Sequence, residues 1–336
     1  MMKKILVTGG AGYIGSHTTL LLLQAGFDVL VLDNFCNSKP EALNRVSRLA
    51  GRSPHIIEGD IRNYDLLNQL FSDYSIDSVI HFAGLKAVGE SVIKPLDYYD
   101  NNVLGSLTLL QAMAHANVTN IVFSSSATVY GDPQSVPISE DFPLSATNPY
   151  GASKLHIEVM LQDLCRADPN WRIAILRYFN PAGAHESGLI GEDPNGMPNN
   201  LMPFIAQVAV GNLKELSIFG NDFDTRDGTG VRDYIHVMDL AEGHLAALIA
   251  LDHHKLITCN LGTGRGYSVL DMVRAFEVAC GKQLPYRIVE RRLGDIAESY
   301  TDPTHAKAMI NWLPRRGLED ICIDHWRWQQ MNPNGY

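Results

Sequence analysis

Short apolar runs alternate with longer segments of helical composition from the start of the chain. Residues 4–8 and 28–33 form apolar runs of strand length, and residues 15–24 between them have helical composition and end before Gly26. This order predicts a strand, a loop, a helix and a second strand within about 30 residues.

The same alternation continues to about residue 180. We expect further strands at residues 55–61, 78–84, 121–126 and 172–180, with helices at 64–71, 101–116 and 150–167. Buried strands that alternate with helices indicate an α/β fold built on a doubly wound parallel (Rossmann-type) sheet. In such sheets ligands bind at the carboxyl ends of the strands, so the residues that follow each strand are candidates for one binding crevice.

The texture of the chain changes after Asn180. Residues 181–200 are rich in glycine and proline and mark a domain boundary or a lid. Beyond them we expect a helix at 201–210, strands at 216–219 and 232–237, a helix from Asp239, and a helix that begins at Ser268, with Asp271 as capping partner, and stops at Gly281. We predict two domains, residues 1–180 and a smaller α/β domain of residues 181–336, of which about 231–262 packs back on the first.

The composition is that of a globular protein that does not bind nucleic acid. Of 336 residues, 46% are hydrophobic and 19% are charged, which is enough apolar material for a large core. The formal net charge is −10 and no run of lysine and arginine exceeds two residues, so a polyanionic backbone finds no basic surface. The first apolar stretch stops at Gly9 and no later one reaches membrane-spanning length, so we expect a cytoplasmic protein with no membrane partner.

Several local patterns resemble those of binding sites, but none has the residue spacing of a metal site. The five cysteines are odd in number and lack a Cys-x-x-Cys pair, and the twelve histidines form no metal-binding motif. The loop 221–228 looks like a calcium loop, but Phe223 and Thr225 fall where carboxylate ligands are expected. The glycine-rich segment 262–266 either cradles a phosphate or makes a tight entry to the following helix. We expect no metal and no disulfide framework.

The loop after the first strand carries glycines at every third position, Gly9, Gly12 and Gly15. Glycines in this context let the backbone approach a pyrophosphate, whose charge then lies at the amino terminus of the helix. Asp33 follows 18 residues after Gly15, where a carboxylate accepts hydrogen bonds from the adenosine ribose and repels a 2′-phosphate. The pattern therefore favours NAD, although Lys39 leaves NADP open.

Tyr150 and Lys154 lie four residues apart, on one face of a predicted helix, and no other tyrosine of the thirteen has a lysine at this spacing. A tyrosine has a pKa near ~10, so acting as a base at pH 7 requires a shift of about three units, or roughly 4 kcal/mol. One unit charge about 5 Å away supplies roughly 3 kcal/mol, so Lys154 and an oxidised nicotinamide would together suffice. Tyr150 would take a hydroxyl proton while hydride passes to the cofactor, and Ser126, at a strand end, would share the hydrogen bond.

These residues resemble the extended short-chain dehydrogenase/reductase family, as does the segment 232–237. Segments 84–91, 98–102, 124–131 and 198–203 are similar to the UDP-glucose 4-epimerases within that family, and the likeness covers essentially the whole chain. The resemblance implies a tightly held NAD that removes hydride from C4 of a UDP-hexose and returns it to the other face of a 4-keto sugar. UDP-glucose and UDP-galactose would thereby interconvert, in galactose metabolism. Family members are usually homodimers, so we expect a homodimer.

The resemblance also implies which residues form the site. Tyr150, Lys154 and Ser126 would be catalytic. NAD would be bound by Gly9, Gly12, Tyr13, Ile14, Gly15, Asp33, Asn34, Asn37, Ser38, Asp60, Ile61, Phe82, Ala83, Gly84, Lys86, Asn101, Ser124, Tyr150, Lys154 and Phe179. The UDP-sugar would be bound by Ser126, Tyr150, Asn180, Asn200, Leu201, Phe219, Arg232, Arg292, Asp295 and Ser299, the arginines serving the diphosphate.

Two other kinds of relative remain open at this point. Sugar-nucleotide dehydratases and decarboxylases place acidic residues after the position of Ser126, where this chain has Ala127 and Thr128. The other class is a nucleotide-binding protein without catalysis, although the serine, tyrosine and lysine are all present. Ser299 stands where epimerases restricted to unmodified sugars carry tyrosine, which predicts that N-acetylated UDP-glucose and UDP-galactose derivatives are also epimerised.

Overall fold

The computed structural model describes residues 3–196, 198, 200–292 and 295–336; Asn199, in the segment 198–203 noted above, lies outside the described residues. A seven-stranded parallel sheet of order β11-β6-β5-β4-β1-β2-β3 forms its centre. Its strands are β1 (Lys4–Thr8), β2 (Asp28–Asp33), β3 (His55–Glu58), β4 (Ser78–His81), β5 (Asn120–Ser126), β6 (Arg172–Tyr178) and β11 (Leu256–Leu261). The strand order reverses between β1 and β4, which confirms the predicted doubly wound, Rossmann-type fold.

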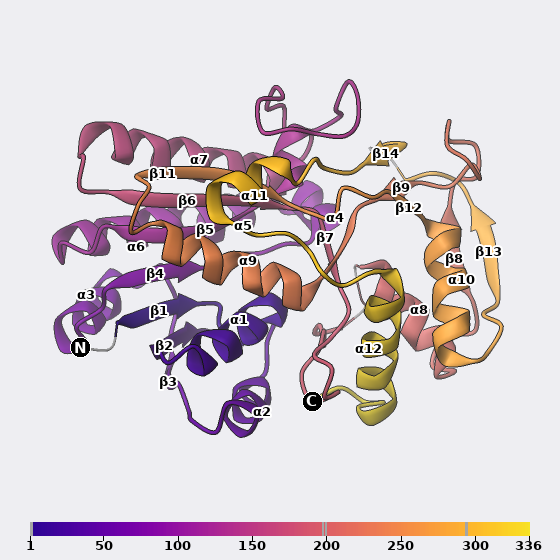
Figure 1. Cartoon of the computed structure of the whole chain (residues 1–336), viewed down its shortest axis with the longest axis horizontal. Helices are drawn as coiled ribbons and strands as arrows, with labels where there is room; N and C mark the ends of the chain where they lie inside the picture. The colour runs from indigo at the N-terminus through magenta and orange to yellow at the C-terminus, as the bar shows by residue number, and fades with distance from the viewer. Residues whose placement is uncertain (1–2, 197, 199, 293–294) are drawn as a thin grey trace.

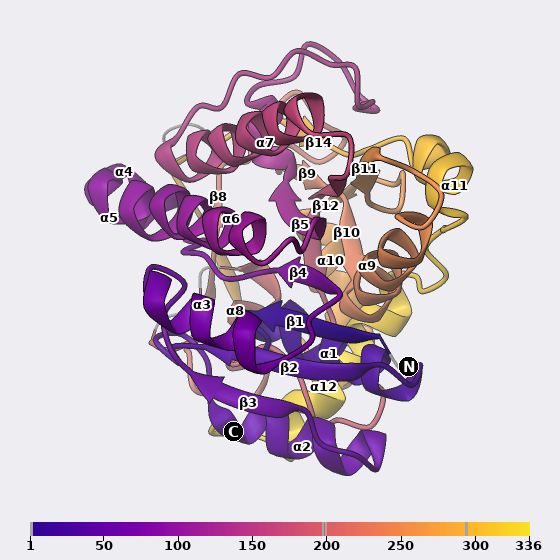
Figure 2. The ribbon, with the colours of Figure 1, turned by 90° about the vertical axis from the view of Figure 1, so that its left-hand side faces the viewer.

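Helices cover both faces of this sheet, because successive side chains of a strand point to opposite sides. In β1, Ile5 and Val7 belong to a core with α1 (Tyr13–Gln24), α2 (Pro40–Ala50), α9 (Val237–Ala250) and α11 (Thr304–Ile310). Leu6, between them, belongs to a second core with α3 (Tyr64–Asp73), α6 (Gly105–His115) and α7 (Pro149–Ala167). The two helical layers and the sheet between them are visible in Figures 1 and 2.

The rest of the chain builds a smaller α/β unit, at the right of Figure 1. There α8 (Leu201–Ala209), α10 (Val269–Cys280) and α12 (Leu318–Met331) pack with β8 (Leu216–Phe219) around a third core, and β13 (Tyr286–Val289) pairs with β8. Two small sheets are β7 (Asn180–Ala182) with β10 (Tyr234–His236), and β9 (Val231–Arg232) between β12 (Tyr267–Ser268) and β14 (Glu298–Ser299). None of the helices within the described residues is long and apolar enough to cross a bilayer.

The predicted elements form, and where their bounds differ the cause is local. The strand expected at 232–237 is split into β9 and β10, and α9 begins at Val237 rather than Asp239. His236 caps that helix, since the Met238 N–H donates to His236 Nδ1 at 3.1 Å.

Two other helices test the sequence signals directly. The predicted capping pair of α10 is confirmed, because the Asp271 N–H donates to Ser268 Oγ and the Ser268 N–H donates to the Asp271 carboxylate, both at 3.0 Å. Gly281 ends α10 in the left-handed conformation, as predicted. The helix expected at 101–116 instead begins with a π-helical turn, Tyr99–Leu104, which follows the short helices α4 (Val88–Ile93) and α5 (Pro95–Tyr98).

Candidate active site

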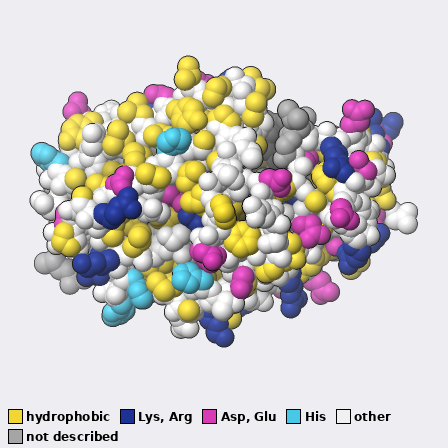
Figure 3. Space-filling view, turned by 90° about the horizontal axis from the view of Figure 1, so that it is seen from above, with side chains coloured by type: hydrophobic (Ala, Val, Ile, Leu, Met, Phe, Trp, Pro, Cys, Tyr) yellow, Lys and Arg dark blue, Asp and Glu magenta, His cyan; other side chains and the backbone are white. Residues whose placement is uncertain are grey.

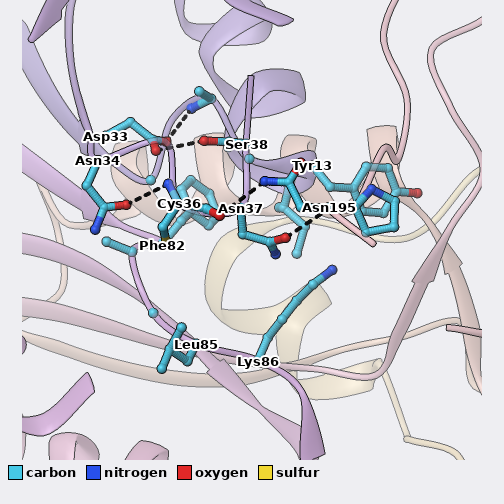
Figure 4. Close-up of a pocket in the computed structure, with 18 of the residues that line it drawn as sticks. Tyr13, Asp33, Asn34, Cys36, Asn37, Ser38, Phe82, Leu85, Lys86 and Asn195 are labelled. Carbon is cyan, nitrogen blue, oxygen red and sulfur yellow. Dashed lines mark hydrogen bonds between the residues drawn. The ribbon is translucent and has the colours of Figure 1, made fainter. Parts of the chain in front are cut away.

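A cavity of about 590 Å³ lies at the carboxyl ends of β1, β2 and β4, where the strand order reverses. Figure 4 shows the side chains around it. It is lined by these residues predicted to bind the cofactor: Gly9, Gly12, Tyr13, Ile14, Gly15, Asp33, Asn34, Asn37, Ser38, Ile61, Phe82, Ala83, Gly84, Lys86, Asn101, Tyr150 and Lys154. The sheet therefore brings side chains from distant parts of the chain into one crevice, as parallel strands require.

Three predicted cofactor residues are not part of this lining. Asp60 sits between Gly59 and Ile61, which do line the cavity, and accepts a hydrogen bond from the Asn34 amide at 3.0 Å. Ser124 contributes its carbonyl, which accepts from Lys154 Nζ at 2.8 Å. Phe179 is buried in a small apolar cluster with Val129, Tyr130 and Ile138. The structure thus places the first two against lining residues and the third inside the protein.

The glycine loop is packed so closely that side chains would not fit. Gly9 has φ +70°, and a Cβ there would lie 2.7 Å from the backbone nitrogen of Ala83. A Cβ on Gly15 would overlap the carbonyl oxygen of Gly9. Gly12 is the N-cap of α1 and makes no side-chain cap, so the first N–H groups of α1 remain open toward the cavity. Such a helix terminus suits the pyrophosphate of a dinucleotide.

Asp33 connects the glycine loop to the loop that follows β2. Its Oδ2 accepts from the Ala11 N–H at 2.9 Å, and its Oδ1 accepts from the Phe35 N–H at 3.0 Å and from Ser38 Oγ at 2.8 Å. A carboxylate oxygen has room for about two hydrogen bonds, so Oδ2 can accept one more, from a ribose hydroxyl. Lys39, the residue that left NADP open, pairs with Asp193 at 2.6 Å, so its charge is already neutralised.

Tyr150, Lys154 and Ser126 meet where α7 crosses the end of β5. Asn148 starts the helix by accepting from the Gly151 N–H at 2.9 Å, and this cap places Tyr150 in the first turn. The Ser126 hydroxyl lies near the Tyr150 phenol and acts to lower its pKa. Lys154 Nζ donates to the Ser124 carbonyl and lies over the Phe123 ring.

Burial has the largest effect on the pKa values of Tyr150 and Lys154. Burial raises the pKa of Tyr150 above its usual value, with Tyr178 acting in the same direction and the Ser126 hydroxyl acting against it. Burial also lowers the pKa of Lys154 to about 8, although Glu158 opposes this. Burial therefore opposes the lower tyrosine pKa that proton abstraction requires, and Lys154 donates to the Ser124 carbonyl.

Five of the residues predicted to bind the sugar nucleotide form a second group outside the cavity lining. Arg232 is half-buried and donates to the carbonyl of Val231 at 2.8 Å, and its removal from water lowers its pKa. Arg292 pairs with Asp295 at 3.0 Å and lies over the ring of Phe219. Ser299 in β14 is in register with Arg232 in β9. Two arginines, an aromatic ring and a small residue thus lie close together in this second group.

The other three predicted sugar-nucleotide residues lie at the junction of the two units. Asn180 is exposed at the start of β7, and Leu201 begins α8. Asn200 lines the cavity, and its amide donates to Glu192 at 2.7 Å. Asn180, Asn200 and Leu201 therefore lie where the cofactor side of the proposed site adjoins the sugar-nucleotide side.

Sequence reasoning missed part of the lining. Glu192, Asp193 and Asn195, from the glycine-rich and proline-rich segment, reach the cavity, as does Tyr336. The only signal was the composition of residues 181–200, which indicated a domain boundary or a lid without naming residues. Tyr178, at the end of β6, also lines the cavity, as expected of a residue at a strand end. No group of three or more histidine, cysteine or acidic side chains is arranged to hold a metal ion within the described part of the chain.

Residues 5–262 match the sequence model of a family described as the NAD dependent epimerase/dehydratase family. The UDP-glucose 4-epimerase of Bacillus subtilis (strain 168) is 59% identical over 333 residues, covering 99% of this chain and 98% of that protein. The UDP-glucose 4-epimerase of Pasteurella multocida (strain Pm70) is 60% identical over 337 residues, covering 99% of both. The crystal structure of UDP-glucose 4-epimerase from Bifidobacterium longum in complex with NAD+ and UDP has a TM-score of 0.97 at 52% identity, covering 99% of this chain and 100% of that one.

Proposed function

The chain belongs to the NAD dependent epimerase/dehydratase family, and we propose that it interconverts UDP-galactose and UDP-glucose with a bound NAD. One observation carries the proposal: the buried Ser126, Tyr150 and Lys154 group stands at the end of a cavity whose glycine loop and Asp33 suit NAD. A role in galactose metabolism belongs to the same proposal, because it follows from this pair of substrates, and we propose a cytoplasmic location.

The residues around the cavity would hold the cofactor. The open N–H groups at the start of α1 would bind the pyrophosphate, and Asp33 would bind the adenosine ribose. Lys86 and Asn101, which line the cavity after β4, complete the cofactor side. When bound, oxidised NAD supplies the hydride acceptor and a positive charge near Tyr150.

Tyr150 moves the proton of the reaction. Its phenolate oxygen would take the proton of the sugar 4-hydroxyl, and bound NAD would supply the acceptor for the hydride from C4, leaving a 4-keto sugar. Ser126 donates a hydrogen bond to the reacting oxygen, and the Lys154 ammonium favours the phenolate form. Once the reduced cofactor had returned the hydride to the opposite face of the keto sugar, Tyr150 would give the proton back to the oxygen on C4. No net oxidation results.

The sugar nucleotide is held by groups outside the cavity proper. Arg232 and Arg292 offer guanidinium groups to the diphosphate, the kind of pairing that such groups favour. For Arg292 this means exchanging its present partner, Asp295, for a phosphate oxygen.

The proposal is tested on the purified protein. Denaturation should release about one NAD per chain, and the intact protein should convert UDP-galactose to UDP-glucose without added cofactor. Tyr150→Phe should keep the NAD and lose the conversion. A protein that releases no NAD, or that binds NAD but converts neither sugar, would overturn the proposal; release of water or carbon dioxide from a sugar nucleotide would favour a dehydratase or a decarboxylase.

We extend the proposal to N-acetylated UDP-sugars, because Ser299 is small and half-buried on β14. The ring of the neighbouring Tyr300 lies against Gly266. Ser299→Tyr should abolish turnover of UDP-N-acetylglucosamine while leaving UDP-galactose turnover within about threefold. Absence of any turnover of the N-acetylated sugars by the unaltered protein would exclude the extension.

A homodimer is supported by an apolar surface on the helices that follow β4. Figure 2 shows α4, α5, α6 and α7 along one side of the molecule, and Figure 3 looks down on the α7 side, where hydrophobic side chains gather at the upper left. The exposed members are Val88, Val92, Ile93, Leu96, Leu104, Leu107 and Val159, with Ile93 80% and Leu96 78% exposed. Solvent-facing apolar groups clustered in this way mark association surfaces.

Light scattering after size-exclusion chromatography tests this part of the proposal. The protein should run as a dimer, and Ile93→Glu with Leu96→Glu should give monomers. Val278→Glu, at an apolar residue 84% exposed on α10, is the matched control and should leave the dimer intact. A native protein that runs as a monomer would rule the dimer out.

A further inference from the structure

Glu192 joins the two sides of the proposed site. Its side chain is only 3% exposed, and one oxygen, Oε1, accepts from Lys86 Nζ at 3.1 Å and from the Asn200 amide at 2.7 Å. Lys86 follows β4 on the cofactor side, whereas Asn200 immediately precedes α8 on the sugar-nucleotide side. A single acceptor atom thus holds two donors from different halves of the site.

Stability does not explain a carboxylate at this position. The second oxygen, Oε2, is buried and has no hydrogen-bond partner among the described residues. A buried acceptor without a partner costs about 1–3 kcal/mol, and more when it is charged. Lys86 is 43% exposed, so its ion pair with Glu192 contributes little to the free energy of unfolding. A buried carboxylate oxygen without a hydrogen-bond partner is an unfavourable arrangement of the kind expected at functional sites.

The loop that carries Glu192 also holds the adenosine end of the cavity. Asp193 accepts from Lys39, and Asn195 donates from its amide to the Cys36 carbonyl at 3.1 Å and from its backbone to Asn37 at 3.3 Å. Figure 4 shows Asn195 beside Asn37, with Lys86 below them. Residues 191–195 therefore connect the adenosine end of the cavity, through Asp193 and Asn195, to Asn200, through Glu192.

We propose that Glu192 is a positioning residue that couples retention of NAD to binding of the sugar nucleotide. The proposal rests on the proposed function, in which Lys86 faces NAD and Asn200 faces the UDP-sugar. When the nucleotide engages Asn200, the shared oxygen is left to Lys86 and holds it more firmly against the cofactor. Coupling between two ligands is reciprocal, so bound NAD also favours the nucleotide.

The measurement is the rate at which bound NAD exchanges with excess isotopically labelled NAD, with and without saturating UDP. In the native holoprotein UDP should slow the exchange at least about fivefold, the lower end of usual coupling between sites. In Glu192→Gln, which keeps the shape and loses the charge, UDP should change the exchange rate less than twofold. Glu215→Gln, which removes an ion pair with Arg287 outside the site, should behave as the native protein does.

A second variant covers the case in which Glu192→Gln does not fold. Asn200→Ala, again at saturating UDP, leaves Glu192 in place and should likewise remove the effect of UDP on NAD exchange. An effect of UDP that persists in either variant at its native size would overturn the coupling and leave the proposed function standing. A native protein that holds no NAD or binds no UDP would overturn both.

Discussion

The buried ion pair between Glu158 and Arg177 anchors the catalytic helix to the sheet. Glu158 lies one turn after Lys154 on α7, and its side chain is fully buried, as is that of Arg177 on β6 except for 3%. Arg177 Nε donates to both carboxylate oxygens at 3.0 and 3.2 Å, and Nη2 adds a third bond at 2.6 Å. Glu158→Gln would remove the charge and keep the shape.

The contacts that remain in the variant determine how much of the free energy of unfolding is lost. Leaving one partner of a buried pair without its counter-charge costs about 3–5 kcal/mol. Arg177 keeps its bonds to the Tyr130 hydroxyl at 3.0 Å and the Glu140 carbonyl at 3.3 Å, so we expect a loss of about 3 kcal/mol. An unfolding entropy of about 2.1 cal/mol/K per residue over 336 residues converts this to a fall of about 4 °C in melting temperature.

Thermal unfolding of the holoprotein, followed by circular dichroism, measures this fall. Glu158→Gln combined with Arg177→Met is the informative control, because neutralising both partners leaves no buried charge and should melt above Glu158→Gln alone. NAD content is recorded for each variant so that loss of ligand is not mistaken for loss of the pair. A single variant that melts within about 1 °C of the native protein, or a double variant that melts lowest, would refute the reasoning.

Three further outcomes follow from the site and the core. Tyr150→Phe should lower turnover about 10²–10⁴-fold with NAD still bound, the usual contribution of a general acid–base group; equal turnover would remove Tyr150 from the mechanism. Gly15→Ala should yield protein depleted of NAD, since the added Cβ overlaps the Gly9 carbonyl; full NAD content would mean that the loop can shift. Burial lowers the pKa of His81 from 6.5 to about 3, so the unfolded chain takes up the proton first as pH falls. The free energy of unfolding from urea titrations should then drop by about 2 kcal/mol between pH 6.5 and 5 for this histidine alone, and a constant value would contradict the assignment.

The parts of the site that could be predicted from sequence are those set by neighbours in the chain. The glycine loop, Asp33 and the Tyr150–Lys154 spacing each lie within one strand, loop or helix, so their geometry follows from local rules. Glu192 could not be found in this way, because it reaches Lys86 across 106 positions of the sequence. Its place depends on how the two units pack, which composition does not reveal.

Elements of the fold were likewise predictable where nearby residues determine them, and were not where distant residues do. The capping pair of α10 was predictable, since Ser268 and Asp271 are three residues apart. α12 was not predicted, because its buried face, which packs in the core shared with α10 and α8, includes the polar residues His325 and Gln329 and so breaks the apolar period. β11 was missed because its role as the last strand of the sheet is visible only once β6 is in place.

The position of β11 has a consequence for how the protein is made. Within the large sheet β6 is covered on its outer side by β11, with pairing that runs from Ile173 with Leu256 to Tyr178 with Leu261. A ribosome that has released only the first 180 residues presents β6 as an open edge, a template for pairing with other chains. The nascent chain must therefore hold this edge unpaired, or under a chaperone, until residue 261 has emerged, and a truncated gene product ending before that point should aggregate rather than fold.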